Sequence, residues 1–398
     1  MRVFNSLGSN YGRGFALKNL FARSRSEDTK KLEAQLGQVF GGQAVLTYKG
    51  RDALELALRR SGLPEGSKVG INGFTCFVVY QAVINAGYQA VFIDVDDGRM
   101  DFGPQQLAQS VSAHPDMKAV IVQNSLGIPV DMNGIKEICQ KQGMLIIEDL
   151  AHSVGATYAD GSLVGTAGAF TMLSFSQDKP IDVVAGGAMI DRLHNVPEPV
   201  TLEQVSGKQR LVNRLYPLFT GWIRALYSIG IGKVLHTVLK SLKLMATPMS
   251  ENIKGLHAMS PQAVASLQVV WPKWQDTIKH RQTVAAIYQQ NLPKELAIFD
   301  SSFGTAAYLR FPLWVENRAQ FIAFMKQNGI YVADTWYDAP VAPPRYMKQT
   351  SYQPDECPRA ESLAKHIVNL PTHEQITPEI AQSICDTIKR WQQSQVQK

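Results

Sequence analysis

Two charged side chains stand near the ends of consecutive apolar runs in the sequence. Asp149 closes the run MLIIED, and Lys179 follows the next run, which ends at Phe175. A lysine that forms a Schiff base, paired with an aspartate that keeps a pyridine nitrogen protonated, is typical of pyridoxal 5′-phosphate (PLP) enzymes. Taken singly, Asp149 is also explained as the cap of a helix, and Lys179 is also explained as a solvated charge on the surface.

A second motif has the residue types that hold a phosphate group. Lys49, Gly50, Arg51 and Asp52 stand where a β-type run passes into a helical pattern. Glycine lets a ligand approach the backbone, and a helix N-terminus attracts phosphate through its free N–H groups. Arg51 could add charge-assisted hydrogen bonds. An ordinary strand–helix turn explains the same residues, and the motif is weaker than a P-loop.

A third motif, NGFTCF at 72–77, combines small and aromatic side chains after another β-type run. Aromatic rings can flank a flat cofactor, but they also pack in protein cores. For at least one of Phe74 and Phe77, a core position is the better explanation.

These motifs lie on a regular alternation of β-type and helical segments. The β-type runs are at 44–47, 68–72, 90–94, 118–123, 144–148, 169–175 and 186–190. Helical patterns, such as those at 53–58 and 78–86, separate the earlier runs. The alternation predicts an α/β fold with a mostly parallel sheet covered by helices on both faces. Ligands of such sheets bind at the carboxyl ends of the strands, where Asp149 lies.

The alternation stops near residue 192, and we predict three parts. Residues 1–39 form a basic N-terminal arm, 40–255 a large cofactor-binding domain, and 256–398 a small C-terminal α/β domain. Residues 192–255 are an insertion in the large domain. The C-terminal part should contain helices near 261–291, 317–328 and 377–395 and a strand near 307–314.

Composition excludes several protein classes. The chain has 398 residues, of which 45% are apolar and 19% charged, so it is neither disordered nor collagen-like. Its four cysteines form no CxxC pair, which predicts a reduced, cytoplasmic protein without a metal site. The N-terminus lacks the features of a secretory signal, and no run of about 18 apolar residues predicts a transmembrane helix.

The net charge of +6 is concentrated in two segments. Residues 207–245 contain seven basic and no acidic residues, and residues 1–31 contribute +5, so the remaining chain carries −6 (6 − 7 − 5). This distribution argues against a uniformly basic protein that coats nucleic acid, and no reader motif for nucleic acid is present.

The segment 207–245 also has apolar side chains near helical spacing. A basic amphipathic stretch with Trp and Tyr is typical of a helix that lies in a membrane interface. An amphipathic helical hairpin that packs on its own protein or on a dimer mate has the same pattern. Both interpretations stay open.

The motifs occur in an order that resembles the DegT-type sugar aminotransferases. The matching segments are GRDAL, NGFTCFVVYQAVINAGYQAVFIDVD, LIIEDLAHSVGATY, LSFSQDK and GGAM. The resemblance covers about residues 40–191 and resumes at 259–268 and 357–377. It implies the PLP-dependent transferase fold of type I, the aspartate-aminotransferase fold, and amination of keto-sugar nucleotides.

The resemblance assigns roles residue by residue. Lys179 stands at the Schiff-base lysine and Asp149 at the carboxylate that meets the pyridine nitrogen, which makes these two the predicted catalytic residues. His152 stands near the cofactor hydroxyl, and Ser174 matches a phosphate-binding serine. The predicted cofactor-binding residues are Gly50, Arg51, Asp52, Thr75, Cys76, Asp149, His152, Ser174 and Lys179.

Several positions depart from the family's pattern. Ser176 stands where a His is common, and Lys49 and Arg51 replace Ser and Thr around Gly50, so charge replaces hydroxyls at the phosphate. Leu256 replaces an Asn that reaches the partner subunit's cofactor. A late His-Tyr pair is replaced by Thr-Trp-Tyr at 335–337. Sugar specificity therefore cannot be carried over.

Lys179 favours an aminotransferase, because relatives that dehydrate their substrates usually have a His at this position. We expect transfer from glutamate to a keto-sugar nucleotide, in amino-sugar or surface polysaccharide biosynthesis, by a homodimer. A peripheral contact of 207–245 with the inner face of the membrane stays open. One alternative is a catalytically silent or regulatory relative held at a membrane. Another is a PLP enzyme of different reaction type, such as a sugar dehydratase.

Overall fold

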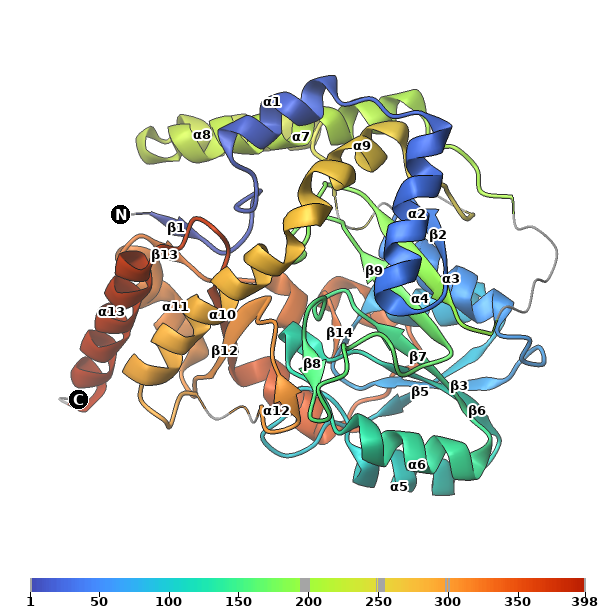
Figure 1. Ribbon diagram of the computed structural model, residues 1–398. Coiled ribbons are helices and arrows are strands. Elements are labelled where there is room, and N and C mark those ends of the chain that lie inside the picture. Colours follow the sequence, from blue (N-terminus) through green and yellow to red (C-terminus); the bar gives the residue numbers. More distant parts are fainter. Residues whose placement is uncertain are drawn as a thin grey trace.

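The computed structural model describes residues 2–193, 201–247, 249, 255–297, 299 and 301–396 (Figure 1). The predicted insertion 192–255 therefore lies partly outside the described residues. Within the part of the chain that is described, no helix combines the length and the apolar character needed to cross a membrane.

A central sheet of seven strands has the order β2-β10-β9-β7-β6-β3-β5. All neighbouring strands are parallel except β10, which is antiparallel to both β2 and β9. The sequence predicts all seven strands to within one residue at each end, and the mostly parallel α/β fold is confirmed. The strands are β2 Gln43–Thr47, β3 Lys68–Asn72, β5 Gln89–Ile93, β6 Met117–Val122, β7 Leu145–Asp149, β9 Phe170–Ser174 and β10 Gly187–Asp191.

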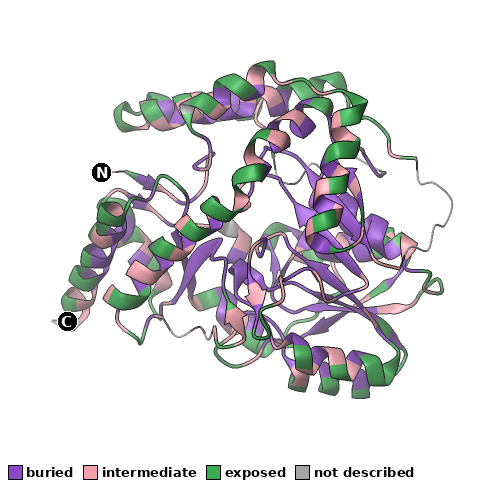
Figure 2. Ribbon diagram, viewed as in Figure 1, coloured by how far each residue is buried: buried purple, intermediate pink, exposed green. Residues whose placement is uncertain are grey.

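Helices cover both faces of this sheet, which is why its strands are almost continuously apolar. Side chains alternate along each strand: Ala119 and Ile121 of β6 join one hydrophobic cluster, whereas Val120 and Val122 join another. The first cluster includes side chains of α3 (Gly50–Arg60) and α4 (Phe77–Asn85). The second includes side chains of α2 (Ser26–Phe40), α5 (Pro104–Ala113) and α6 (Met132–Gln142). Figure 2 shows the buried strands between helices with exposed outer sides.

The last third of the chain contains the predicted helices and strand. Helix α9 (Pro261–Val270) and helix α10 (Trp274–Asn291) are separated by a 3₁₀ turn at Trp271–Lys273. This turn contains a proline, which cannot donate a helical hydrogen bond. The predicted strand is β12 (Arg310–Trp314), which pairs antiparallel with β15 (Ile367–Pro371). The remaining helices are α11 (Arg318–Gln327), α12 (Pro358–His366) and α13 (Pro378–Val396).

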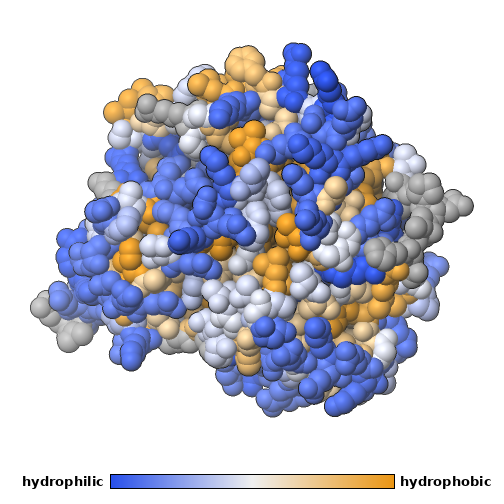
Figure 3. All heavy atoms as spheres, in the orientation of Figure 1, coloured by the Kyte–Doolittle hydropathy of each residue, from blue (hydrophilic) through white to orange (hydrophobic). Residues whose placement is uncertain are grey.

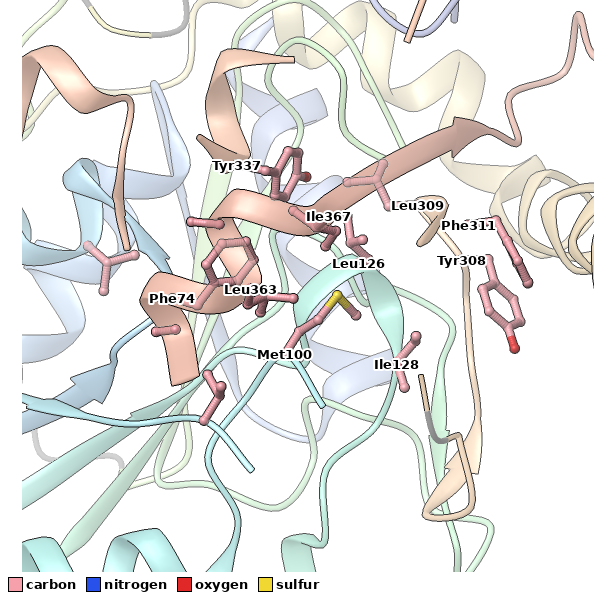
Figure 4. Packing of buried hydrophobic residues seen from close by; sticks show 14 of the residues in the cluster. Phe74, Met100, Leu126, Ile128, Tyr308, Leu309, Phe311, Tyr337, Leu363 and Ile367 are labelled. Atoms are coloured by element: carbon pink, nitrogen blue, oxygen red, sulfur yellow. The ribbon is translucent and has the colours of Figure 1, made fainter. Parts of the chain in front are cut away.

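Short strand pairs join this last third to earlier parts of the chain. β1 (Val3–Phe4) pairs with β13 (Ile330–Tyr331), and β8 (Thr157–Tyr158) pairs with β11 (Gly304–Thr305). β4 (Thr75–Cys76) pairs with β14 (Val341–Ala342), which brings the late segment against a predicted cofactor motif. Figure 4 shows the packing beside this junction, where Phe74, Leu363 and Tyr337 lie in one hydrophobic cluster.

The described part of the predicted N-terminal arm, 1–39, contributes buried side chains and packs against the rest of the chain. Tyr11 and Asn19 are buried, and β1 forms part of a strand pair. Helix α1 (Arg13–Phe21) packs on α7, and α2 buries Leu32 and Leu36 completely. The segment looked peripheral because its few buried side chains are separated by exposed basic ones. The boundaries of the three domains stay a prediction.

The described part of the insertion forms two helices. Helix α7 (Gly207–Leu226) leads through a 3₁₀ turn at Tyr227–Ile229 into helix α8 (Ile231–Ser241). Gly230 joins them with a φ of 81°, which favours glycine. Helices α1, α7 and α8 lie together at the top of the molecule in Figure 1.

Candidate active site

Eight of the nine predicted cofactor-binding residues line one pocket at the carboxyl ends of the central strands. They are Gly50, Arg51, Thr75, Cys76, Asp149, His152, Ser174 and Lys179. The last third of the chain completes the wall with Leu309, Arg310, Trp336 and Tyr337. Parallel strands place their carboxyl ends along one edge of the sheet, which explains why motifs 130 residues apart meet (179 − 49).

Asp149 is the last residue of β7 and is only 3% exposed. Its Oδ1 accepts a hydrogen bond of 2.8 Å from the backbone N–H of Ala151. Burial raises the pKa of Asp149 to about 6, although this hydrogen bond and the charge of Lys179 oppose the shift. A cationic partner stabilises a buried carboxylate, and a protonated pyridine nitrogen is such a partner.

Lys179 is partly buried in the loop between β9 and β10. Burial lowers its pKa, and the negative charges of Cys76 and Asp149 oppose this shift when those groups are ionised. Arg310 lowers the pKa further by charge repulsion. A lowered pKa increases the neutral fraction of the amine, which is the nucleophilic form that attacks an aldehyde.

The loop that carries Lys179 is fastened to the N-terminal segment. Asn10 Nδ2 donates to the backbone oxygen of Lys179 and to Asp182 Oδ2, at 3.2 Å each. Tyr11 donates its hydroxyl hydrogen to Asp182 Oδ1. Asp182 Oδ2 also accepts from the backbone N–H of Asp178 at 2.8 Å. One buried carboxylate thus connects the lysine loop to residues that lie about 170 positions earlier.

His152 is held as a neutral imidazole. Its Nδ1 accepts a hydrogen bond of 3.2 Å from the backbone N–H of Leu126. Burial lowers the pKa of His152 well below its usual value, and the charges of Lys179 and Arg310 lower it further. A neutral ring that accepts at Nδ1 carries its proton on Nε2, which can donate to an oxygen atom of a bound molecule.

The start of α3 forms a close-packed corner with β9 and β10. A Cβ on Gly50 would lie 2.8 Å from Cβ of Ser174, so only glycine fits here without displacing its neighbour. A Cβ on Gly187, the first residue of β10, would lie 2.5 Å from the carbonyl carbon of Lys49. The N-terminus of α3, a serine hydroxyl and Arg51 therefore border the same end of the pocket.

Lys49 adds a further buried cation at this corner. It is 6% exposed, and its Nζ donates to the backbone oxygen of Thr247 at 2.9 Å. Burial and the charge of Arg51 lower the pKa of Lys49 to about 7. A helix N-terminus, a hydroxyl and two cations suit a phosphate, while Asp149 suits a pyridinium and Lys179 an aldehyde. The donor set of this pocket therefore fits PLP.

Asp52 does not line the pocket, unlike the other predicted residues of its motif. Its Oδ1 accepts from the backbone N–H of His257 at 3.3 Å, and the His257 ring lies 3.9 Å away. Asp52 thus connects α3 to the segment after the insertion. Next to it in the sequence, Leu256 is 8% exposed and belongs to the hydrophobic core of its own chain. The side chain at the position of the family's cross-subunit Asn therefore packs inward.

Sequence reasoning missed several polar residues that line the pocket, among them Gln123 and Arg310. Gln123, directly after β6, accepts the hydroxyl hydrogen of Thr75 through Oε1 at 2.6 Å. Arg310 is 4% exposed, forms an ion pair with Asp334, and lies over the ring of Tyr337. An arginine inside the apolar run YLRFPLWV is an unusual feature and could have identified Arg310 as a candidate.

The fold and this pocket together define the class of protein, a PLP-dependent aminotransferase of fold type I. The model of the DegT/DnrJ/EryC1/StrS aminotransferase family matches residues 16–217 and 254–389, so the chain belongs to this family. The resemblance seen in the sequence is confirmed. Residues 218–253, which include the end of α7 and all of α8, lie outside the match.

Two curated relatives are similar over most of their length. A UDP-2-acetamido-2-deoxy-3-oxo-D-glucuronate aminotransferase of Pseudomonas aeruginosa is 23% identical, with 90% of this chain and 89% of the relative covered. The spore coat polysaccharide biosynthesis protein SpsC of Bacillus subtilis is 22% identical, with 92% and 90% covered. A UDP-N-acetyl-3-dehydro-alpha-D-glucosamine 3-aminotransferase of Acidithiobacillus ferrooxidans is 33% identical, but over 40% of this chain and 43% of the relative.

Solved structures share the fold. PseC of Helicobacter pylori, an aminotransferase involved in the biosynthesis of pseudoaminic acid, aligns with a TM-score of 0.71 and 14% identity. The alignment covers 98% of this chain and 99% of PseC. A DegT DnrJ EryC1 StrS aminotransferase from Brucella abortus also has a TM-score of 0.71, at 21% identity and 95% coverage of both chains.

Proposed function

We propose that the protein transfers an amino group from glutamate to a keto-sugar nucleotide, in the biosynthesis of an amino sugar or a surface polysaccharide. The observation that carries this proposal is the pocket in which Lys179 and Asp149 lie with the phosphate-binding corner of α3. The names of the relatives from Pseudomonas aeruginosa and Acidithiobacillus ferrooxidans, both aminotransferases acting on oxidised UDP-sugars, support the substrate class.

Different residues of the pocket would hold different parts of the cofactor. When bound, PLP supplies an aldehyde and an electron-withdrawing ring that stabilises negative charge on carbon. Gly50, Arg51 and Ser174 would hold the phosphate, and Asp149 would keep the ring nitrogen protonated. His152 would donate its Nε2 hydrogen to the ring oxygen.

Lys179 would act as the acid and base of both half-reactions. Its lowered pKa provides a neutral amine at working pH, which can take a proton from the amino donor. The same group, once charged, can return a proton to the sugar carbon that receives nitrogen. The negative charges of Asp149 and Asp178 raise the pKa of Lys179 and so partly offset the decrease that burial causes. This balance suits a group that must both accept and release a proton.

A product analysis tests the proposal. The purified full-length protein, supplied with PLP and glutamate, is incubated with a panel of keto-sugar nucleotides, and the products are identified by mass spectrometry. We expect an amino sugar and 2-oxoglutarate in equal amounts, and no product with Lys179→Ala. A dehydrated sugar would instead support the dehydratase alternative. A protein that binds PLP but acts on no sugar and no donor would support the catalytically silent alternative.

We also propose a cytoplasmic homodimer that contacts the inner face of a membrane peripherally through 207–245. Support for the dimer is the family's habit of building its site across a two-fold axis. Support for the membrane contact is the net charge of +7 on a segment without acidic residues. Sedimentation of the holoenzyme, which should give about twice the mass of 44.0 kDa, tests the dimer.

A further inference from the structure

Exposed hydrophobic side chains gather on the three helices α1, α7 and α8, together with the turn between α7 and α8. Together with the residues next to them, these elements make up residues 2–25 and 204–247, which we call the helical layer. Among the described residues, eleven large hydrophobic side chains are exposed, and nine of them lie in the helical layer. Phe21 is 76% exposed, Val234 and Ile229 are 65% exposed, and Trp222 is 50% exposed. Figure 3 shows hydrophobic atoms along the upper edge of the molecule, over α8 and α1.

Packing within the chain accounts for only part of the amphipathic pattern. Helix α7 buries Val212, Tyr216 and Ile223, and α1 packs against it. Helix α8 buries only Gly232 and Leu239. Its exposed apolar residues recur at intervals of three and four, which places them on one face of the helix. These are Ile231, Val234, Val238 and Leu242, the last directly after the helix end.

The helical layer is also the most basic part of the protein. Residues 2–25 and 204–247 contain no Asp or Glu but five and seven Lys or Arg residues, a net charge of +12 (5 + 7). The rest of the chain therefore carries −6 (6 − 12). The apolar face and the positive charge occur on the same elements. A partner of this layer must therefore both cover apolar side chains and carry negative charge.

The outer part of this layer lies outside the family match. The family match omits residues 218–253, which contain Trp222, the turn and α8. The turn and α8 supply none of the residues that line the pocket, and all of those residues except Met249 lie inside the matched ranges. Their exposed apolar face therefore needs a separate explanation.

A second copy of this chain fits the helical layer poorly. A two-fold interface sets the same surface against itself, so two copies would bring two acid-free, basic surfaces together. Like charges that face each other oppose association. A head-to-tail contact between the layer and the acidic body of a second copy would build a ring or a filament rather than a two-fold dimer.

We propose that α1, α7 and α8 together form a surface that binds anionic membranes. This proposal extends the contact proposed above for 207–245 to the N-terminal helix, and it names the lipid class. Acyl chains would cover Phe21, Trp222 and the apolar face of α8, while lipid phosphates would pair with the lysines and arginines around them. Trp222, which is 50% exposed, is a side chain that favours the membrane–water boundary. The helices lie on the membrane and do not cross it.

Vesicle flotation of the full-length holoenzyme tests the proposal. The protein should float with vesicles of phosphatidylcholine and phosphatidylglycerol, stay below with phosphatidylcholine alone, and be released at about 1 M salt. The double variant Val234→Glu, Val238→Glu should lose at least tenfold in partitioning, and Phe21→Glu should also lose partitioning if α1 belongs to the surface. A matched control is Ile84→Glu, Val269→Glu, because these exposed positions lie outside the helical layer. The control should float like the wild type.

The remaining outcomes overturn the proposal. Equal flotation of the Val234/Val238 variant and the wild type would show that α8 is not the contact, and full flotation of Phe21→Glu would remove α1 from it. Conversion of a dimer to a monomer by the Val234/Val238 variant, measured by sedimentation without lipid, would make this face an interface between copies. Thermal unfolding and amino transfer in solution are measured for every variant. A protein that floats but transfers no amino group would refute the proposed reaction and leave the docking surface intact.

Discussion

Burial shifts the pKa values of the two central residues toward each other. The pKa of Asp149 rises to about 6, and that of Lys179 falls, while the charge of each group favours the ionised form of the other. Burial weakens the stabilisation of both ionised groups by solvent, so each depends more on charged neighbours. A change at one residue should consequently alter the charge state of the other, which makes single substitutions in this pocket informative.

The variant Asp149→Asn keeps the size of the side chain and removes its charge. We expect kcat to fall about 10²- to 10³-fold, the range found when one preorganised electrostatic group is removed from an active site. The pKa of Lys179 should fall further, because the Asp149 charge raises it in the wild type. Steady-state kinetics measure the first effect, and the pH dependence of the rate at which the cofactor-free protein takes up PLP measures the second. An unchanged kcat with full PLP occupancy would show that Asp149 does not act on the cofactor.

Lys49 should make phosphate binding depend on pH. Its pKa of about 7 means that the side chain is charged below pH 7 and mostly neutral above it. Pyridoxine 5′-phosphate has the phosphate but no aldehyde, so its affinity reports the phosphate corner alone. Between pH 7 and pH 8.5 we expect its affinity, measured by calorimetry, to fall about tenfold, because a neutral Lys49 no longer attracts the dianion.

Two variants separate Lys49 from Arg51. Lys49→Gln should lower the affinity at pH 6.5 and abolish its decrease toward pH 8.5. Arg51→Gln should lower the affinity but shift the decrease to higher pH, because the Arg51 charge is one cause of the lowered Lys49 pKa. A pH profile that is identical in wild type and Lys49→Gln would exclude Lys49 from the phosphate site.

At the scale of elements, the segment before α1 connects the lysine loop to the helical layer. Tyr11 donates to Asp182, which holds the loop, and the backbone oxygen of Tyr11 accepts from Arg224 of α7 at 3.1 Å. Burial raises the pKa of Asp182 to about 7. Stability from a raised carboxyl pKa is complete below the unfolded value near 4 and is lost as the pH rises through 7. The hydrogen bonds of Asp182 should therefore hold the lysine loop less firmly at pH 7 and above than at pH 4.

The variant Tyr11→Phe tests whether this connection positions Lys179. Loss of the hydroxyl should lower kcat about 5- to 50-fold and change KM little, because a displaced loop misplaces the reacting amine. The matched control is Tyr216→Phe, which alters a buried ring packed edge-on against Tyr11. Tyr11→Phe should also lose about 1 kcal/mol of stability, the usual net value of a buried hydrogen bond. If both variants lower kcat equally, the effect is general loosening and not positioning.

Strands that are marked by an unbroken run of apolar residues are predictable from the sequence, whereas single contacts between distant residues are not. The strands of the central sheet are buried on both faces, so their apolar runs are unbroken and mark β7 and β9 to within a residue. The burial of Tyr11 and Asn19 depends on α7 and α9, which lie about 200 residues away, and no local pattern reports it. Asp52 was grouped with its motif, but the helical geometry of α3 turns it toward His257.

At the scale of the molecule, charge and catalysis occupy different regions. The pocket lies at the carboxyl ends of the central strands, within a body that carries −6, while the helical layer carries +12. Such an asymmetric distribution creates a field that orients the molecule near an anionic surface, with the helical layer foremost. The same asymmetry keeps the acidic body away from that surface. Orientation therefore follows from the net charges alone, before any apolar contact forms.

Replacing three lysines of the helical layer tests whether vesicle binding depends on the charge of this layer or on the net charge of the whole protein. Each basic residue near an anionic membrane contributes about 1 kcal/mol, so Lys233→Gln, Lys240→Gln, Lys243→Gln should weaken vesicle binding roughly 100-fold. The matched control replaces Lys118, Lys136 and Lys141 of β6 and α6 by Gln, with the same loss of charge on the acidic body. Figure 1 shows α6 at the opposite end of the molecule from α8, so the control changes charge away from the proposed contact. Vesicle flotation at physiological salt should therefore show a large loss for the first variant and little for the second, whereas equal losses would mean that only the total charge matters.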